Sequence, residues 1–321
     1  MEWFAETFSH AQQWLHETLF QPVLFALGFG NLLEDAYTAA GWLLVGLLQI
    51  AVLLAVFGPL QRWRPVEAVS DRRAIRTDIL YTLIHRLGLF RVALFFLVEP
   101  LFDELIGAMH VAGWGTLHLD ALAGVEAHPV ASLLLYLVVL DFADYWIHRG
   151  QHGLNWWWNL HALHHSQRQM TMWSDNRNHL IDDLVRDSLI VLLAQLIGVA
   201  PGQFIAIVAV TQLSESLQHA NLRLSFGRFG ERLWISPRFH RLHHSIGIGH
   251  ETRGKGTLGG HNFGVLLPWW DMLFRTANFE NRYDPTGVRD QVEPGPRGLR
   301  DYGRGFWSQQ WLGLKRLVGA A

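Results

Sequence analysis

The chain of 321 residues contains no cysteine and only two lysines, Lys255 and Lys315. Without cysteine there is no disulfide, no thiolate metal ligand and no thiol nucleophile, so any bound metal must be held by nitrogen and oxygen atoms. Charged residues are scarce, at 17% of the chain, and a formal net charge of −2 predicts no nucleic-acid partner. Hydrophobic residues make up 50% of the chain, which is typical of a membrane protein.

Four apolar runs are close to the length needed to cross a bilayer: residues 41–60, 79–102, 130–147 and 188–213. The second carries His85, Arg86 and Arg91, which must turn toward protein, water or the interface. Pro201 and Gly202 interrupt the fourth, and because proline cannot continue a helical hydrogen-bond ladder, we expect a hairpin there. The predicted fold is an all-α integral membrane protein. It has about three transmembrane helices plus a helical hairpin, capped by a cytosolic helical His-rich metal domain.

The distribution of arginine predicts the orientation. Residues 1–61 contain no lysine or arginine, nor does the segment 103–129. The loop after the first run is rich in arginine, as is the chain after the hairpin. Because basic loops stay in the cytoplasm, we expect a multi-pass protein with its N-terminus outside and its histidine clusters and C-terminus on the cytoplasmic side. The N-terminus lacks the features of a removable signal peptide, so we expect the first crossing to direct its own insertion.

Histidine, by contrast, is abundant, with 18 residues. Two clusters share the spacing His-x-x-His-His: His161, His164 and His165, and then His240, His243 and His244. Chance predicts roughly 0.06 such clusters in a chain of this composition. Two clusters therefore indicate a selected site, and the residue type indicates a metal.

Other residues extend this metal site. His148 and His152 are one helical turn apart just before the first cluster, and His219 follows the hairpin. Since residues three or four apart share a helix face, each histidine group can present its rings to one centre. Nine imidazoles exceed the needs of one ion, so we predict two metals; neutral imidazole suits Zn, Cu, Fe or Ni.

Three further side chains are candidates for this site. Asp144, four residues before His148, is placed to accept the ring N–H of a ligating histidine, or to make a helix-packing hydrogen bond. Glu215, one turn before His219, is a candidate ligand or a base beside one. For His179 we expect either a surface position or a place near the substrate, and it is, like Glu215, a candidate for the last metal ligand or for a residue that supports one.

The order of these histidines resembles that of the fatty acid hydroxylase family, also called the sterol desaturase family. Flanking residues over about 130–276 also match that family: Asp144-Tyr145-Trp146, Ser166, Arg177-x-His179, Gln218-His219-Ala220-Asn221, Asn262-Phe263-Gly264 and Trp270-Asp271-x-Leu273-Phe274. The resemblance implies a di-iron oxygenase that hydroxylates or desaturates a lipid such as a sterol, fatty acyl chain or alkylglycerol. It would use two iron ions, O2 and electrons from a separate cytochrome b5-like or ferredoxin-like carrier, and it makes Asn262 a further candidate ligand or supporting residue.

Two differences from the family are visible. Some members have histidine where this chain has Glu215, which leaves the tenth ligand open, and many have proline where Leu180 stands. A haem-binding or metal-binding electron-transfer protein of the membrane is the alternative function, although adjacent triplets of histidine differ from the single axial pairs that bind haem. A di-zinc hydrolase would usually add carboxylates, and neither cluster contains one.

We therefore divide the chain into three parts. Residues 1–129 are an N-terminal membrane region with two crossings, and residues 130–276 are a catalytic domain like that of the fatty acid hydroxylases. Residues 277–321 are a loosely ordered linker ending in a helix rich in tryptophan and leucine. That helix either lies in the membrane interface or packs on the cytosolic domain.

Overall fold

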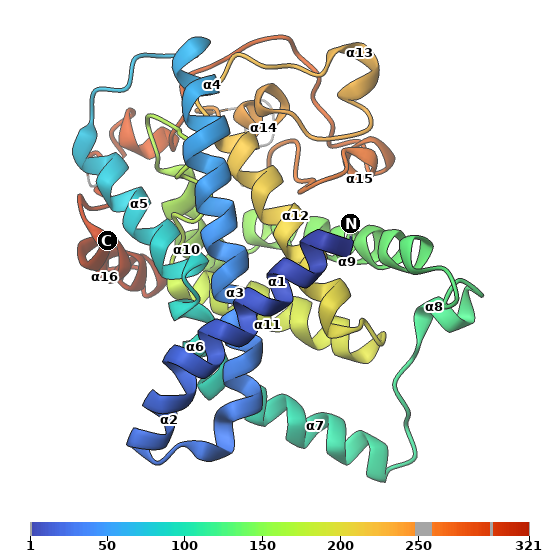
Figure 1. Ribbon diagram of the computed structural model, residues 1–321. Coiled ribbons are helices and arrows are strands. Elements are labelled where there is room, and N and C mark those ends of the chain that lie inside the picture. Colours follow the sequence, from blue (N-terminus) through green and yellow to red (C-terminus); the bar gives the residue numbers. More distant parts are fainter. Residues whose placement is uncertain (1, 248–258, 296–297, 321) are drawn as a thin grey trace.

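The computed structural model describes residues 2–247, 259–295 and 298–320, and these residues form helices joined by loops (Figure 1). The described residues include no strand, only two isolated bridges, Ser245 to Thr286 and Gly295 to Gly298. The predicted all-α fold is therefore confirmed. His250, which has no ligand spacing in the sequence, lies outside the described residues.

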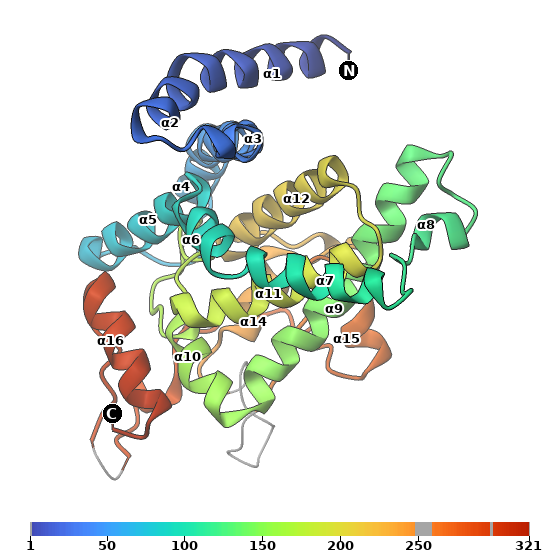
Figure 2. The ribbon, with the colours of Figure 1, turned by 90° about the horizontal axis from the view of Figure 1, so that it is seen from below.

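The first apolar run lies within a longer helical segment. This segment, Gly30–Trp63, is long and apolar enough to cross a membrane. It consists of η2 (Gly30–Leu32), α3 (Leu33–Val52), η3 (Leu53–Phe57) and α4 (Gly58–Trp63). Before it come α1 (Glu2–Leu15), η1 (His16–Phe20) and α2 (Gln21–Leu27), which the sequence analysis did not predict. The α1 helix lies on the outer side of α3 (Figure 2), where the Gln12 amide donates to the Tyr37 carbonyl oxygen at 2.8 Å.

The second apolar run forms two helices joined at a bend, which the sequence analysis did not predict. It forms α5 (Arg72–Arg86) and α6 (Leu89–Leu97), bent by 52°, and is followed by α7 (Glu99–Val111). The bend is at Gly88, whose φ of 81° is a left-handed conformation that favours glycine. The buried Arg86 faces protein, as predicted, and its guanidinium lies 2.7 Å from the Asp175 carboxylate.

Helices α3 and α5 approach each other closely at Gly46, where an added Cβ would overlap the backbone carbonyl oxygen of Arg86. We expect Gly46→Ala to lower the free energy of unfolding by about 3 kcal/mol, because a backbone atom cannot move aside as a side chain can. Thermal unfolding in detergent measures this. The control is Gly107→Ala on α7, where a Cβ would meet nothing within 4 Å; equal melting temperatures for the two variants would contradict the prediction.

The third and fourth runs match the expected elements. After α8 (Leu119–Leu122), helix α9 (Pro129–Gly153) is the second helix suited to crossing a membrane. The predicted break at Pro201 separates α11 (Leu180–Leu196) from α12 (Pro201–His219), and both helices contact α9. The link between them contains Gly198 at a φ of 80°, and Pro201 occupies the first turn of α12, where its missing N–H costs nothing. Counting the bent pair as one span, three segments of the described residues are long and apolar enough to cross a membrane.

The chain after α12 carries the second histidine cluster and packs against the first. It contains α13 (Gly227–Gly230), α14 (Pro237–His243), α15 (Trp269–Leu273), η4 (Arg289–Gln291) and α16 (Phe306–Leu317). The expected loose linker is instead attached to the clusters, since the Gly287 N–H donates to the His244 carbonyl oxygen at 3.2 Å and the Thr286 hydroxyl donates to the Gln167 carbonyl oxygen at 2.9 Å.

Helix α16 packs on the domain. It lies against α10 (Asn155–His165) and α5, and the Arg316 guanidinium donates to the Asn159 carbonyl oxygen at 3.0 Å. Its outer face carries Trp307 and Trp311, which are 80% and 59% exposed. Of the two alternatives for this helix, packing on the domain is observed. Only its outer face, with Trp307 and Trp311, is free to contact the membrane interface.

Candidate metal centre

The histidines converge from four helices. Helix α9 ends at Gly153, and α10 begins at Asn155, so the chain reverses and places the two helices side by side. The end of α12 adds one histidine. Helix α14 adds the last cluster; it begins with Pro237 and is capped by the Ser236 hydroxyl, which accepts from the Phe239 N–H at 3.2 Å.

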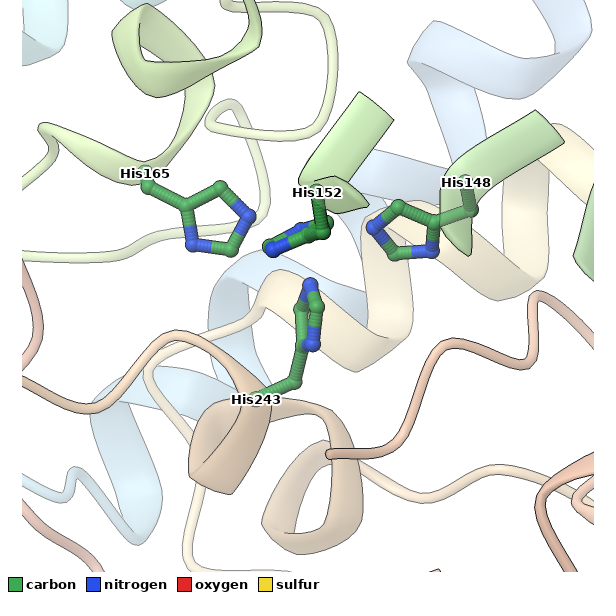
Figure 3. A group of neighbouring side chains, drawn as sticks. All are labelled: His148, His152, His165 and His243. Carbon is green, nitrogen blue, oxygen red and sulfur yellow. The ribbon is translucent and has the colours of Figure 1, made fainter. Parts of the chain in front are cut away.

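Eight histidines form two groups, in each of which the candidate ligand atoms lie within 4.8 Å of one another. The first group is His148, His152, His165 and His243; the second is His164, His219, His240 and His244. All eight side chains are buried. Figure 3 shows the rings of the first group pointing toward one another from α9, α10 and α14.

The grouping differs from the expectation that each His-x-x-His-His cluster serves one centre. His164 belongs to the second group and its neighbour His165 to the first, and His243 and His244 divide in the same way. Consecutive residues on a helix point about 100° apart, so one cluster can supply ligands to two sites on either side of it. Each His-x-x-His-His cluster therefore supplies candidate ligands to both four-histidine groups.

Backbone carbonyl groups fix several rings in one tautomer. The Nδ1 atoms of His148, His219 and His243 lie 2.8, 2.8 and 2.7 Å from the carbonyl oxygens of Phe263, Glu215 and His261, respectively. A carbonyl oxygen only accepts, so each Nδ1 donates and the lone pair is on Nε2. Such rings are prepared to bind a metal through Nε2.

The spacing of the second group fits a metal ion. The Nε2 atom of His219 lies 3.1 Å from Nε2 of His164 and 3.1 Å from Nε2 of His240, which is also 3.1 Å from Nε2 of His244. Nitrogens about 2.0–2.1 Å from a shared ion lie about 2.9–3.4 Å apart in octahedral or tetrahedral geometry. Because Nε2 of His219 carries the lone pair, it donates to neither neighbour, and the three spacings match those of nitrogens around one shared cation.

Burial keeps these rings neutral. It is the main cause of a pKa well below the ordinary histidine value in four rings, and the neighbouring histidines add to it: His164, His165, His240 and His244. A neutral imidazole keeps the lone pair that a metal requires.

His161, the ninth predicted ligand, belongs to neither group. Its ring centroid lies 5.3 Å from those of His148 and His164, so it stands between the groups. Nδ1 is 2.9 Å from the Asp182 carboxylate, and Nε2 has no hydrogen-bond partner among the described residues. His161 therefore has a buried nitrogen without a partner among the described residues, and its ring lies close to members of both groups.

Asp144 and Glu215 contact an arginine instead of a ring. The Arg186 guanidinium donates two hydrogen bonds to Asp144, at 3.0 and 3.1 Å, and lies 3.4 Å from Glu215. Of the two alternatives for Asp144, the structure shows the helix-packing contact, from α9 to Arg186 of α11, and not a hydrogen bond to a histidine ring. Asp182 of the same helix has that role, toward His161.

Asn262 supports a loop and lies outside both groups. Its amide donates to the carbonyl oxygens of Phe239 and Asn278 at 2.9 and 3.0 Å, and its side-chain oxygen accepts from the Asn278 N–H at 2.6 Å. With a φ of 61°, Asn262 has a left-handed conformation that asparagine tolerates well. The loop it fixes carries the carbonyl groups of His261 and Phe263 that orient two rings.

His179 is neither at the surface nor in the metal centre. It is buried, its Nδ1 accepts from the Ile181 N–H at 3.2 Å at the start of α11, and its Nε2 donates to the Gln310 carbonyl oxygen of α16 at 3.0 Å. Gly313 allows this contact, because a Cβ there would overlap the His179 ring. His179 therefore attaches α16 to the domain.

We expect His179→Ala to lower the melting temperature and leave the metal content unchanged, since the variant loses two hydrogen bonds but no ligand. The free energy of unfolding should fall by about 2 kcal/mol. Metal analysis beside thermal unfolding distinguishes this from a ligand role. Loss of metal from a variant that is still folded would show that the interpretation is wrong.

Two adjoining cavities lead to the histidines. The larger, about 650 Å³, lies among α3, α6, α9, α11 and α12 and is lined mainly by apolar side chains. The smaller, about 90 Å³, is bordered by five of the histidines: His148, His161, His164, His219 and His240. Both are lined by Arg186, Asp187, Gln212 and Glu215, so these residues form a neck between them. The sequence analysis assigned no substrate-binding residue and missed both Arg186 and Asp182, which no local spacing marks.

Comparison with known proteins gives one family and several relatives. The fatty acid hydroxylase model matches residues 133–276. The ornithine lipid hydroxylase OlsE of Rhizobium tropici is 28% identical over 259 residues, covering 79% of this chain and 73% of the relative. Alkylglycerol monooxygenase of Caenorhabditis elegans is 26% identical over 148 residues, covering 45% of this chain and 26% of the relative. Fatty acid hydroxylase vlmA of a Lecanicillium species is 25% identical over 174 residues, covering 49% and 44%. No solved structure matches the chain.

Proposed function

The chain belongs to the fatty acid hydroxylase family, and on that premise we propose that it is a membrane-bound di-iron oxygenase that hydroxylates a lipid with O2. The observation that carries the proposal is the pair of buried four-histidine groups beside an apolar cavity. The relatives bear the names of an ornithine lipid hydroxylase, an alkylglycerol monooxygenase and a fatty acid hydroxylase, which favours hydroxylation over desaturation.

The donor set supports two iron ions, one in each group. Imidazole binds Zn, Cu, Fe and Ni, but zinc has no redox chemistry, and the reaction of a lipid C–H bond with O2 requires a redox metal. Two iron ions, when bound, supply the activation of O2. His161 is proposed as a ninth nitrogen donor between the groups, and Glu215 is not assigned as a ligand because Arg186 holds its carboxylate.

The protein's own contribution is orientation and exclusion of water. The carbonyl groups of Phe263, Glu215 and His261 hold three rings with Nε2 directed inward, and Asp182 holds a fourth. The cavity of about 650 Å³ is large enough for hydrocarbon chains, and it fixes which carbon reaches the centre.

The membrane arrangement follows the arginine distribution. We propose that the N-terminus lies outside and the histidine groups and C-terminus lie on the cytoplasmic side, with residues 1–129, 130–276 and 277–321 as membrane region, catalytic domain and C-terminal segment. A separate cytochrome b5-like or ferredoxin-like protein delivers electrons from the cytoplasm. Exposed Trp307 and Trp311 of α16 suit the headgroup layer.

The geometry does not favour the haem alternative. Axial ligands of haem stand on opposite faces of a wide macrocycle. Here four candidate atoms lie within 4.8 Å of one another in each group, which leaves space for an ion but none for a porphyrin.

Lipid profiling tests the reaction. Cells expressing the protein should contain an oxygenated lipid that takes up ¹⁸O from ¹⁸O2, and cells expressing His165→Ala should lack it. Exposed His10, mutated to alanine, is the matched control and should retain the product. A product that forms equally without oxygen would refute the oxygenase proposal.

A further inference from the structure

His85 and Asp183 form a pair on the wall of the small cavity, which five of the histidines also border. Nδ1 of the His85 ring lies 2.9 Å from the Tyr81 carbonyl oxygen, and Nε2 lies 3.0 Å from the Asp183 carboxylate. The carbonyl oxygen only accepts, so Nδ1 donates to it. A lone pair on Nε2 would then oppose the lone pairs of the carboxylate, so a proton lies between these two atoms. The pair thus holds one proton that can be released.

The other ion pairs on the wall of the small cavity involve guanidinium groups. The Arg86 guanidinium donates to the Asp175 carboxylate at 2.7 Å, and the Arg186 guanidinium lies 3.4 Å from Glu215. A guanidinium keeps its protons in proteins, so it supplies none to a reaction. The pair of His85 and Asp183 differs from these two pairs because its proton lies between an imidazole and a carboxylate, both of which exchange protons near neutral pH or below.

The charges around His85 suit a protonated ring. Asp183 and, one helical turn later on α11, Asp187 act on the ring with their negative charges. Arg91, at the start of α6, acts on Asp187 and lies over the Trp42 ring at 3.5 Å. The side chains of His85 and Asp183 are 11% and 8% exposed, so water can reach the pair and restore a proton that it has released.

Unpaired polar atoms extend from this pair along the small cavity. Asp175, Asn176 and Gln218 line it, and each has a buried side-chain atom without a hydrogen-bond partner among the described residues: Oδ1 of Asp175, the amide nitrogen of Asn176 and Oε1 of Gln218. Buried polar atoms usually bind ordered water where protein offers no partner, and a cavity of about 90 Å³ holds several water molecules. Such water would connect His85 with the metal centre by hydrogen bonds.

We propose that His85, paired with Asp183, is the proton donor of the oxygenase reaction. This inference rests on the proposed function and adds a residue to it. In hydroxylation a C–H bond breaks and a C–O bond forms with one oxygen atom of O2. The other oxygen atom leaves as water after taking up two electrons from the external carrier and two protons. The pair gives its proton to the water of the small cavity, which passes it to the leaving oxygen, and solvent recharges the pair once in each turnover so that the second proton follows.

Nitrogen NMR tests the proton without turnover. The sample is the full-length protein labelled with ¹⁵N-histidine and loaded with zinc, which fills the histidine groups and has no redox chemistry. The signals of His85 are those lost in His85→Gln. We expect both ring nitrogens of His85 to carry a proton at neutral pH, whereas the rings of the two groups should be neutral. A neutral His85 ring would overturn the inference and leave the oxygenase function intact.

Turnover without the donor is the second test. His85→Gln retains a side chain that can bond to Asp183 but has no proton to release. We expect this variant to keep both metal ions and to form the lipid product about 100-fold more slowly, because a general acid contributes a factor of this order. The reaction should also slow further in D2O than it does for the unmodified protein, since proton transfer then limits the rate.

Two further variants complete this test. Asp183→Asn removes the partner of the ring and should be slowed in the same way. His128→Gln, exposed before the start of α9, is the matched control and should change neither the rate nor the effect of D2O. An unchanged rate in His85→Gln, or a slower rate that D2O does not lower further, would overturn the inference. Absence of product from the unmodified protein would instead refute the proposed function.

Discussion

Replacement of His243 by alanine is expected to remove the ion of the first group and leave that of the second, whereas His244→Ala should do the reverse. The two residues are adjacent in sequence but belong to different groups. A structural metal site depends on each of its few ligands, so loss of one of four should empty that group under dialysis. Each variant should retain about one ion per chain, and the double variant should retain none, as measured by elemental analysis.

Activity should fall much further than metal content. Mutation of a residue that only supports a metal ligand usually lowers activity by about 10–100-fold. Loss of one of the two ions should lower activity further, so we expect either single variant to be inactive. The control is His10→Ala, which should keep both ions and full activity. If His243→Ala and His244→Ala each lost both ions, the two groups would be one interdependent site, and if neither lost any, the ligand assignment would be wrong.

Local spacing predicted the features that neighbouring residues encode. Apolar runs of sufficient length located α3 and α9, and Pro201 located the break between α11 and α12. The two His-x-x-His-His clusters identified six of the nine buried nitrogen donors around the centre, the pair His148 and His152 added two, and the position of His219 at the end of a helix added the ninth. These patterns depend on helical geometry alone, so no tertiary contact was needed to read them.

Long-range contacts determined what the spacing did not. Asp144 has the correct register to meet His148, but Arg186, 42 residues away, takes its carboxylate. The bend in the second apolar run was also not predicted, because it depends on the left-handed conformation of Gly88, which the apolar pattern does not reveal. The role of His179 was also not predictable from local spacing, because its partner, Gln310, lies on α16, 131 residues away.

Asp182 is the clearest example of a residue whose role depends on long-range contacts, because no local sequence pattern indicates that role. Its side chain is buried and accepts three hydrogen bonds: from the Gln151 amide at 2.7 Å, from the Trp157 indole at 2.7 Å and from Nδ1 of His161 at 2.9 Å. These donors come from α9 and α10. One carboxylate of α11 therefore holds together the two helices that carry five of the histidines and fixes the ring that stands between the groups.

We expect Asp182→Asn to lower the free energy of unfolding by about 3–5 kcal/mol and the metal affinity by about 10–100-fold, because the new amide opposes a donor with a donor and releases the His161 ring. Thermal unfolding measures the first effect and competition with a chelator the second. The control is Asp183→Asn, which breaks the neighbouring contact to His85 at 3.0 Å without touching a ring of either group; it should reduce stability and leave metal affinity unchanged. If both variants lost metal affinity equally, the effect would come from α11 as a whole, and Asp182 would not be the residue that orients the centre.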